Sequence, residues 1–206
     1  MLNLEKNFLK KRILIYGLGK SGLSTYSYLK KNNIISLYDD RIITKKNIKD
    51  TYTTYKEIIK KEFDCIIISP GIDINNCKLS RFLKKNYKKI YTDLDIFYSR
   101  YAFNQKITIT GTNGKSTTAK LLYDILKDQK KDVRLVGNIG NPVLLEKKIK
   151  KDTLFVIEAS SYQLEYSKLF KTNISLILNI SPDHLERHKT INKYVSAKFK
   201  LIKNQS

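Results

Sequence analysis

The chain has 206 residues, of which 41% are hydrophobic and 29% charged, and its formal net charge at pH 7 is +21. This length and composition fit a soluble globular protein that holds two domains or parts of two. No apolar run approaches the roughly 18 residues that cross a bilayer, and the N-terminus lacks the apolar stretch of a signal peptide. We therefore expect a cytoplasmic protein with no membrane partner.

The positive charge comes mostly from lysines that are spread along the whole chain. No aromatic RNA-binding motif, helix-turn-helix pattern or zinc finger accompanies them. A charge surplus alone sets non-specific affinity for nucleic acid, so we expect a solvated surface that favours anionic ligands and no specific nucleic-acid partner. A nucleic-acid-dependent ATPase remains an alternative.

The first part of the chain alternates between apolar runs and amphipathic stretches. We expect strands at residues 11–16, 34–38, 64–69 and 89–91. We expect helices at residues 20–32, 55–63 and 79–86. Strands that alternate with helices favour an α/β fold with a parallel, doubly wound sheet, whose ligand crevice lies at the carboxyl ends of the strands. This pattern therefore predicts that residues 1–97 form a Rossmann-like domain.

The loop after the first strand reads GLGKSG, from Gly17 to Gly22. Its G-x-G-x-x-G spacing is typical of a turn that presents a helix N-terminus to a pyrophosphate. NAD and a sugar nucleotide both carry such a group, so the glycines do not distinguish them. A hydride-transfer site would also need a nicotinamide pocket and a catalytic acid or base, and the sequence suggests neither.

The alternation starts again at residue 106, after a boundary region at residues 93–105. We expect strands at residues 106–110, 133–136, 154–158 and 174–179. We expect helices at residues 115–129 and 191–202. Residues 98–206 therefore predict a second α/β domain.

The loop GTNGKST opens the helix at residue 115 and predicts a phosphate cradle, because its backbone N–H groups and the helix N-terminus face an anion. It departs from a standard P-loop, which would need glycine at Ile109. Lys115 can reach the β- and γ-phosphates of ATP and the Ser116 hydroxyl can ligate Mg²⁺. Glu158 ends an apolar strand, where a P-loop ATPase carries its metal-holding acid. The expected ATP-binding residues are Gly111, Thr112, Asn113, Gly114, Lys115, Ser116 and Thr117.

The stretch NISPDHLERH carries two histidines four residues apart. Zinc is disfavoured because the spacing is not H-E-x-x-H and no third ligand is evident. Pro182 places the stretch in a loop. We expect His184 beside a phosphate or Mg²⁺ site and His188 on the solvated surface.

Five ordered motifs together resemble the central domain of the Mur ligases. They are ITITGTNGKSTTAKLL, GNIGNP, VIEASSYQLE, NISPDHLERH and YVSAKFKLI. The GKST form, SPGI at residues 69–72, SSYQLE and the compact N-terminal domain are most similar to the family members that join D-glutamate to UDP-N-acetylmuramoyl-L-alanine. The resemblance runs from about residue 13 to the end of the chain. It implies that the second domain is the incomplete, P-loop ATPase-type domain of such a ligase.

The resemblance also implies a UDP-sugar, and not NAD, in the first domain. Gly19, Lys20 and Ser21 would then lie near its pyrophosphate, and Asp39, Asp40 and Arg41 near its uridine. Ser69 and Gly71 would line the same crevice. Asn138 and Ser160 would orient substrate or phosphate groups in the second domain.

The implied reaction is amide formation driven by ATP in peptidoglycan synthesis, and through it in cell-wall biogenesis, cell shape, cell division and the cell cycle. An acyl phosphate forms first, and the amine of D-glutamate then displaces phosphate. The implied catalytic residues are Lys115, Glu158, His184 and Lys198. Ser116, Glu158, His184 and Lys198 would be the Mg²⁺ ligands, the lysine as a carbamate.

Family members continue for about the same length again, through a C-terminal domain that closes over ATP. We therefore expect no complete turnover from residues 1–206 alone, and a separately encoded C-terminal domain is one conceivable partner. A non-catalytic nucleotide-binding remnant and another member of the family are the remaining alternatives.

Overall fold

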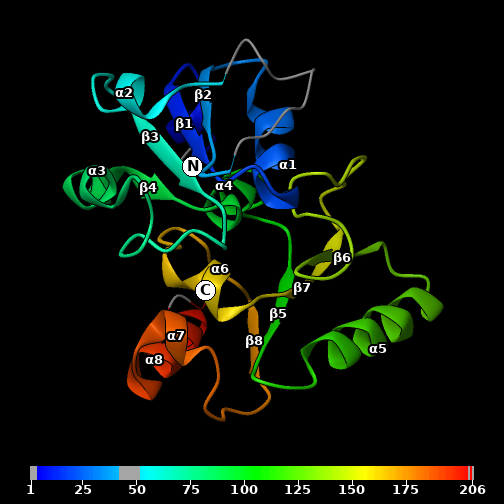
Figure 1. Ribbon diagram of the computed structural model, residues 1–206. Helices are drawn as coiled ribbons and strands as arrows, with labels where there is room; N and C mark the ends of the chain where they lie inside the picture. Colours follow the sequence, from blue (N-terminus) through cyan, green and yellow to red (C-terminus); the bar gives the residue numbers. More distant parts are fainter. Residues whose placement is uncertain (1–3, 42–51, 204, 206) are drawn as a thin grey trace. The chain divides into compact units, whose positions relative to one another are not determined.

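The computed structural model describes residues 4–41, 52–203 and 205 (Figure 1). The chain folds as two compact units, residues 1–100 and 101–206. The boundary expected after residue 97 falls inside the helix α4 (Asp93–Arg100). Each unit contains its own four-stranded parallel sheet.

The first unit alternates strands and helices as predicted. Its strands are β1 (Arg12–Tyr16), β2 (Ile34–Tyr38), β3 (Cys65–Ile68) and β4 (Ile90–Tyr91), in the sheet order β2-β1-β3-β4. Its helices are η1 (Leu4–Phe8), α1 (Lys20–Leu29), α2 (Tyr55–Ile58), α3 (Ser80–Lys85), η3 (Tyr87–Lys89) and α4. The order places a topological switch point beside β1, because the chain moves to β2 on one side and to β3 on the other.

The strand β1 forms the centre of the first core. Ile13, Leu14, Ile15 and Tyr16 have no exposed surface. Parallel strands that are covered on both faces read as continuous apolar runs, which is why this strand was visible in the sequence. The helix α2 is shorter than predicted, because residues 60–62, which follow it, are exposed and continue no apolar face.

The helix α4 was not predicted, and its residues were assigned to the boundary region. Leu94, Ile96 and Phe97 are buried, so the helix has an apolar face. Asp95 is also buried, and its carboxylate accepts a hydrogen bond from the backbone N–H of Thr92 at 2.9 Å, which offsets the cost of burying this polar group. An acidic residue that caps a helix start breaks the apolar pattern while stabilising the helix.

The second unit carries β5 (Lys106–Thr110), β6 (Val133–Gly137), β7 (Leu154–Glu158) and β8 (Ile174–Ile177), in the order β6-β7-β5-β8. Its helices are α5 (Lys115–Asp128), α6 (Ser161–Glu165), α7 (Leu185–His188) and α8 (Ile191–Lys203). The helix α5 packs against β5, β6 and β7, whereas α8 packs against β8, α6 and α7 (Figure 1). Ile109, Ala119, Val133 and Val156 form the core between α5 and the sheet.

The prediction of a loop throughout NISPDHLERH is wrong for its last four residues, which form α7. Pro182 precedes this turn and does not enter it. The short helix α6 was also missed; it begins with a capping box in which Ser160 and Gln163 satisfy each other's backbone N–H groups. Over the described part of the chain, no helix combines the length and the apolar character needed to cross a bilayer.

Candidate functional site

The predicted phosphate turn, Gly17–Gly22, lies at the carboxyl end of β1, beside the switch point of the first sheet. The backbone N–H of Gly17 donates to the carbonyl of Tyr38 at the end of β2, at 2.9 Å. The Ser69 hydroxyl, at the end of β3, donates to the carbonyl of Gly17 at 2.7 Å. The turn is therefore fixed from both neighbouring strands.

The glycines at this edge of the sheet differ in whether the fold itself requires them. A Cβ on Gly22 would lie 1.8 Å from the carbonyl oxygen of Gly17, so the fold itself requires glycine there. Gly19 has an ordinary φ of −71°, and a Cβ on it or on Gly71 would meet no described atom within 4 Å. Gly19 caps the N-terminus of α1, so the open space beside it suits the close approach of an anion.

The polar side chains of the turn do not all face this space. Lys20 is exposed at the first position of α1. The Ser21 hydroxyl instead donates to the carboxyl group of Asp93, which is buried and whose pKa is raised by that burial. The Ser21 hydroxyl therefore already has a partner within the fold.

Asp39 and Asp40 stabilise loops in this structure. The carboxylate of Asp39 accepts the backbone N–H of Leu18 at 2.6 Å and that of Arg41 at 2.9 Å, one on each oxygen. Asp40 accepts the Tyr16 hydroxyl at 2.7 Å. In dinucleotide-binding Rossmann domains an acid after the second strand binds the ribose hydroxyls. Here both oxygens of the corresponding acid already have backbone donors.

The second cradle, residues 111–117, joins β5 to α5. Gly111 and Gly114 have φ values of +154° and +80°, and Gly114 caps α5 in the left-handed region that favours glycine. Asn179, the first residue of the NISPDHLERH stretch, was not predicted as a site residue; its side chain accepts the backbone N–H of Asn113 at 2.9 Å. The Lys115 ammonium folds back onto the carbonyl of Thr112 at 2.6 Å.

Glu158, at the end of β7, is fully buried and meets the start of α5. Its Oε2 accepts the Ser116 hydroxyl and its Oε1 accepts the Asn138 side-chain amide, both at 2.8 Å. A Cβ on Gly137 would lie 2.2 Å from the Glu158 carbonyl, which explains the glycine of the GNIGNP loop. The Asn138 side chain, which was expected to orient substrate, thus forms a hydrogen bond with the Glu158 carboxylate.

The surroundings of Glu158 fit a divalent cation. No arginine or lysine in the described part of the chain forms an ion pair with this buried carboxylate. An unneutralised buried charge is costly, and a carboxylate beside a hydroxyl is the oxygen donor set that Mg²⁺ prefers. Ser116 and Glu158 are therefore suited to hold Mg²⁺.

Lys198, on α8, reaches the same loop from another side. It is 1% exposed, and its ammonium donates to the carbonyl of Gly111 at 2.7 Å and lies 4.6 Å from the Tyr194 ring centroid. Burial, reinforced by the charge of Lys115, lowers the pKa of Lys198 to about 8.

His184 lies before α7 in the left-handed region, with φ +52°, a conformation that costs a non-glycine residue about 1–3 kcal/mol. Its ring packs 4.8 Å from that of Tyr162 and 6.3 Å from that of Tyr194, whose hydroxyl contacts the Thr112 hydroxyl at 3.0 Å. No hydrogen bond or ion pair joins His184 directly to Glu158 among the described side chains. The described residues also contain no group of three acidic, histidine or cysteine side chains that could hold a metal.

The expectation that His188 is solvated is wrong. The residue is 3% exposed, and its Nε2 lies 3.0 Å from the Ser161 hydroxyl. Burial lowers the pKa of this imidazole. The turn of α7 directs His188 inward, toward α6, whereas the sequence suggested only a polar loop.

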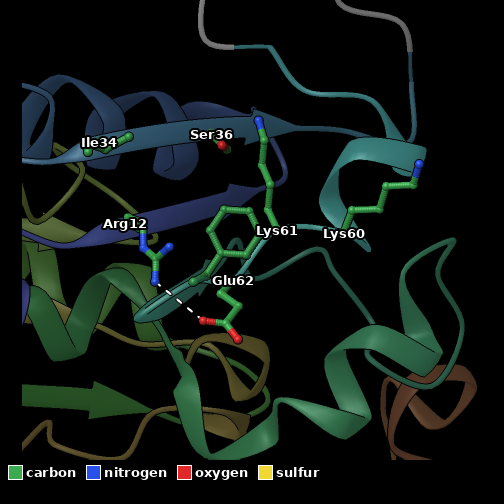
Figure 2. Close-up of a pocket in the computed structure, with 7 residues that line it drawn as sticks. Arg12, Ile34, Ser36, Lys60, Lys61 and Glu62 are labelled. Carbon is green, nitrogen blue, oxygen red and sulfur yellow. Dashed lines mark ion pairs between the residues drawn. The ribbon is translucent and has the colours of Figure 1, made fainter.

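A pocket of about 460 Å³ occurs elsewhere in the first unit (Figure 2). Arg12 and Glu62 face each other across it, in an ion pair of 3.7 Å. Arg12 and Ile34, which also lines it, begin β1 and β2. The pocket therefore lies at the amino ends of these strands, away from the carboxyl ends that carry the phosphate turn.

Comparison with known families covers most of the chain. The family model for the Mur ligase MurD-like N-terminal domain matches residues 11–90, and the model for the Mur ligase middle domain matches residues 109–206. The chain belongs to the Mur ligase family. Both matched regions carry the cradles described above, one in each Mur ligase domain.

Curated relatives share the name UDP-N-acetylmuramoylalanine–D-glutamate ligase. The protein from Rickettsia bellii is 36% identical over 198 residues, which are 94% of this chain and 43% of the relative. The protein from Wolbachia pipientis wMel is 37% identical over 98% of this chain and 40% of its own length. This Mur ligase chain thus spans less than half the length of these relatives.

Solved Mur ligase structures share the fold. The UDP-N-acetylmuramate:L-alanyl-gamma-D-glutamyl-meso-diaminopimelate ligase of Neisseria meningitides gives a TM-score of 0.58 at 13% identity, over 96% of this chain and 69% of that one. The UDP-N-acetylmuramate-alanine ligase of Thermotoga maritima gives 0.54 at 19% identity, over 95% of this chain and 47% of that one. At these identities the likeness concerns the fold alone.

Proposed function

We propose that this chain is the N-terminal and middle part of an ATP-dependent ligase that adds D-glutamate to UDP-N-acetylmuramoyl-L-alanine in peptidoglycan synthesis. The observation that carries the proposal is the hydrogen bond between Ser116 and the buried carboxylate of Glu158, directly at the start of the second cradle. The names of the relatives support the choice of substrates. A cytoplasmic location and a role in cell-wall growth and division follow from the same proposal.

The second cradle would hold ATP. The backbone N–H groups of residues 111–117 and the Lys115 ammonium would take the β- and γ-phosphates, and the ammonium would leave the Thr112 carbonyl to do so. Ser116 and Glu158 would hold Mg²⁺, which supplies positive charge to the phosphates. Asn138 would keep the Glu158 carboxylate oriented.

The first cradle would hold the UDP group. Open space beside Gly19 and Gly71 leaves room for a diphosphate at the N-terminus of α1. The Asp39 carboxylate accepts two backbone N–H groups, so this acid stabilises the turn and is not by itself a sign of NAD. Arg41 remains a candidate contact for the uridine.

The reaction would proceed in two displacements. A carboxylate oxygen of the alanyl group bonds to the γ-phosphorus while the bond to the β-phosphate oxygen breaks, which gives an acyl phosphate and ADP. The amine of D-glutamate then attacks the acyl carbon, phosphate leaves, and the nitrogen loses a proton. Two anions meet in the first step, so the Lys115 charge must lie between them.

Lys198 is proposed to carry a carbamate. Only a neutral amine adds CO₂, and burial lowers the pKa of Lys198 to about 8, which raises the neutral fraction near neutral pH. The product is an anion, which the nearby Lys115 charge favours. His184 would lie on the same side of the loop, beside Tyr194.

Titration calorimetry of the 206-residue chain tests the first cradle. We expect saturable binding of UDP-N-acetylmuramoyl-L-alanine and none of NAD at the same concentration. Binding of NAD, or of neither ligand, would overturn the assignment. The alternative of a non-catalytic nucleotide-binding remnant predicts binding but no product when the missing part of the relatives is supplied as a second chain.

A further inference from the structure

Three consecutive side chains of α7 each contact a side chain of α6. The pairs are Glu186 with the Tyr162 hydroxyl at 2.9 Å, Arg187 Nε with Glu165 at 2.9 Å, and His188 Nε2 with the Ser161 hydroxyl at 3.0 Å. We call this set the α6–α7 clamp. A helix of only four residues forms few backbone hydrogen bonds of its own, so these three side-chain contacts stabilise it.

The clamp holds a turn that is bounded by unfavourable backbone conformations. His184 precedes α7 with φ +52° and Lys189 follows it with φ +66°, both in the left-handed region that non-glycine residues avoid. The carbonyl of His184 accepts the backbone N–H groups of Arg187 and His188 at 3.1 and 3.0 Å. Such conformations persist only where surrounding contacts determine them.

His188 and its partner Ser161 are the buried members of the clamp. His188 is 3% exposed, and its ring lies 5.7 Å from that of Tyr162 and 5.4 Å from that of Tyr194. The same two tyrosine rings flank His184. A change at His188 therefore reaches His184 both through the backbone of the turn and through the two aromatic rings.

The partner of His188 connects this turn to the carboxylate site. Ser161 begins α6, which follows directly on the strand that ends at Glu158. We propose that His188, through its hydrogen bond to Ser161, is a positioning residue that fixes His184 relative to the segment carrying Glu158. The inference rests on the proposed function in one respect, namely that His184 serves the phosphate and metal site.

Hydrogen exchange of the 206-residue chain tests the clamp without any ligand. S161A removes the hydroxyl, and we expect amide exchange at residues 184–189 to rise about tenfold, as for the loss of one hydrogen bond. H188Q retains a polar group on the same side and should have a smaller effect. S99A deletes another buried hydroxyl, which donates to the Ile96 carbonyl at 2.7 Å in the first unit, and should leave residues 184–189 unchanged. Unchanged exchange in S161A would overturn the clamp.

Imidazole NMR tests the positioning. The chain has only two histidines, so H188Q assigns both sets of ring signals. With Mn²⁺ and ADP added in small amounts, we expect the His184 signals to broaden more than the His188 signals in the wild type, and the broadening of His184 to be at least several-fold weaker in S161A. Equal broadening in both proteins would show that the clamp does not position His184.

The two experiments separate the inference from the proposed function. A wild-type His184 signal that Mn²⁺ and ADP leave sharp contradicts the metal role of His184, and the positioning role falls with it. The exchange data then still decide whether His188 and Ser161 hold the turn.

Discussion

The Ser116 hydroxyl and the Glu158 carboxylate lie 2.8 Å apart, although the two residues are 42 positions apart in the sequence. The contact exists because β5 and β7 are neighbours in register, so the loop after one strand meets the last residue of the other. This geometry places a buried acid at the start of the phosphate-binding helix, and it makes the acid the most informative residue to change.

E158Q retains the shape of the side chain and removes its charge. We expect the affinity for Mn²⁺ in the presence of ADP to fall about 100-fold, since a carboxylate ligand is lost. The measurement is Mn²⁺ titration followed by electron paramagnetic resonance. E62Q, an exposed acid in the first unit, is the control and should bind as the wild type does. Equal affinities for E158Q and wild type would refute the carboxylate site.

K115M should weaken ADP binding about 100-fold, because the only removed group is the ammonium proposed to reach the β-phosphate. K120M changes a lysine of the same helix that pairs with Asp124 at the surface. It should have little effect, which controls for the general loss of positive charge. Fluorescence titration with a labelled ADP checks both variants, and similar losses in the two would point to non-specific electrostatics.

G19A and G22A should separate binding from folding. A Cβ on Gly22 collides with the Gly17 carbonyl, so G22A should lower the free energy of unfolding by about 3 kcal/mol. A Cβ on Gly19 meets only open space, so G19A should cost less than about 1 kcal/mol. Only G19A should then report on the ligand, with a loss of UDP-N-acetylmuramoyl-L-alanine affinity in calorimetry. Undiminished affinity in folded G19A would argue against a diphosphate at this turn.

Lys106 should give the fold a measurable pH dependence. It is 1% exposed, and burial lowers its pKa to about 8, against about 10.4 for an unfolded chain. Between these values the unfolded state binds more protons, so this residue makes the free energy of unfolding rise with pH, by up to about 1.4 kcal/mol per pH unit. Below pH 8 both states are protonated and the contribution is constant.

The matched variant is K106M, which lacks the titrating group. Urea unfolding of both proteins from pH 7 to 9.5 should show the wild type gaining stability relative to K106M above pH 8. The difference removes the opposite effect of Cys65, whose pKa burial raises to about 11. A difference that stays constant across this range would mean that the ammonium is not buried in solution.

Much of the sheet architecture was predictable because its strands are buried. Residues 34–38, 106–110 and 154–158 were expected as strands and form β2, β5 and β7 with the same bounds. Parallel strands covered on both faces appear as apolar runs whatever their neighbours are. The helices α4 and α6 were missed because polar residues that make capping hydrogen bonds, Asp95 and Ser160, interrupt the apolar pattern at the N-terminal ends of these helices.

The site was predictable where a motif sets local geometry, and unpredictable where tertiary contacts do. GTNGKST predicted that Ser116 lies at a helix start, and the apolar run at residues 154–158 predicted that Glu158 ends a strand. The amide of Asn138 on that carboxylate, and the hydrogen bond of His188 to Ser161, depend on which loops meet in space. The spacing of residues in the sequence does not show which loops come into contact in the folded chain.

The open space at Gly19 and Gly71 has a consequence for large-scale mutagenesis. Variants at these two positions should accumulate in cells to normal amounts, because the polypeptide can accommodate a methyl group there. Gly17 and Gly22, by contrast, should be depleted in any screen for intact protein. Maps of abundance and of growth would therefore agree at Gly17 and Gly22 and differ at Gly19 and Gly71, and that difference would mark the phosphate turn without any bound molecule.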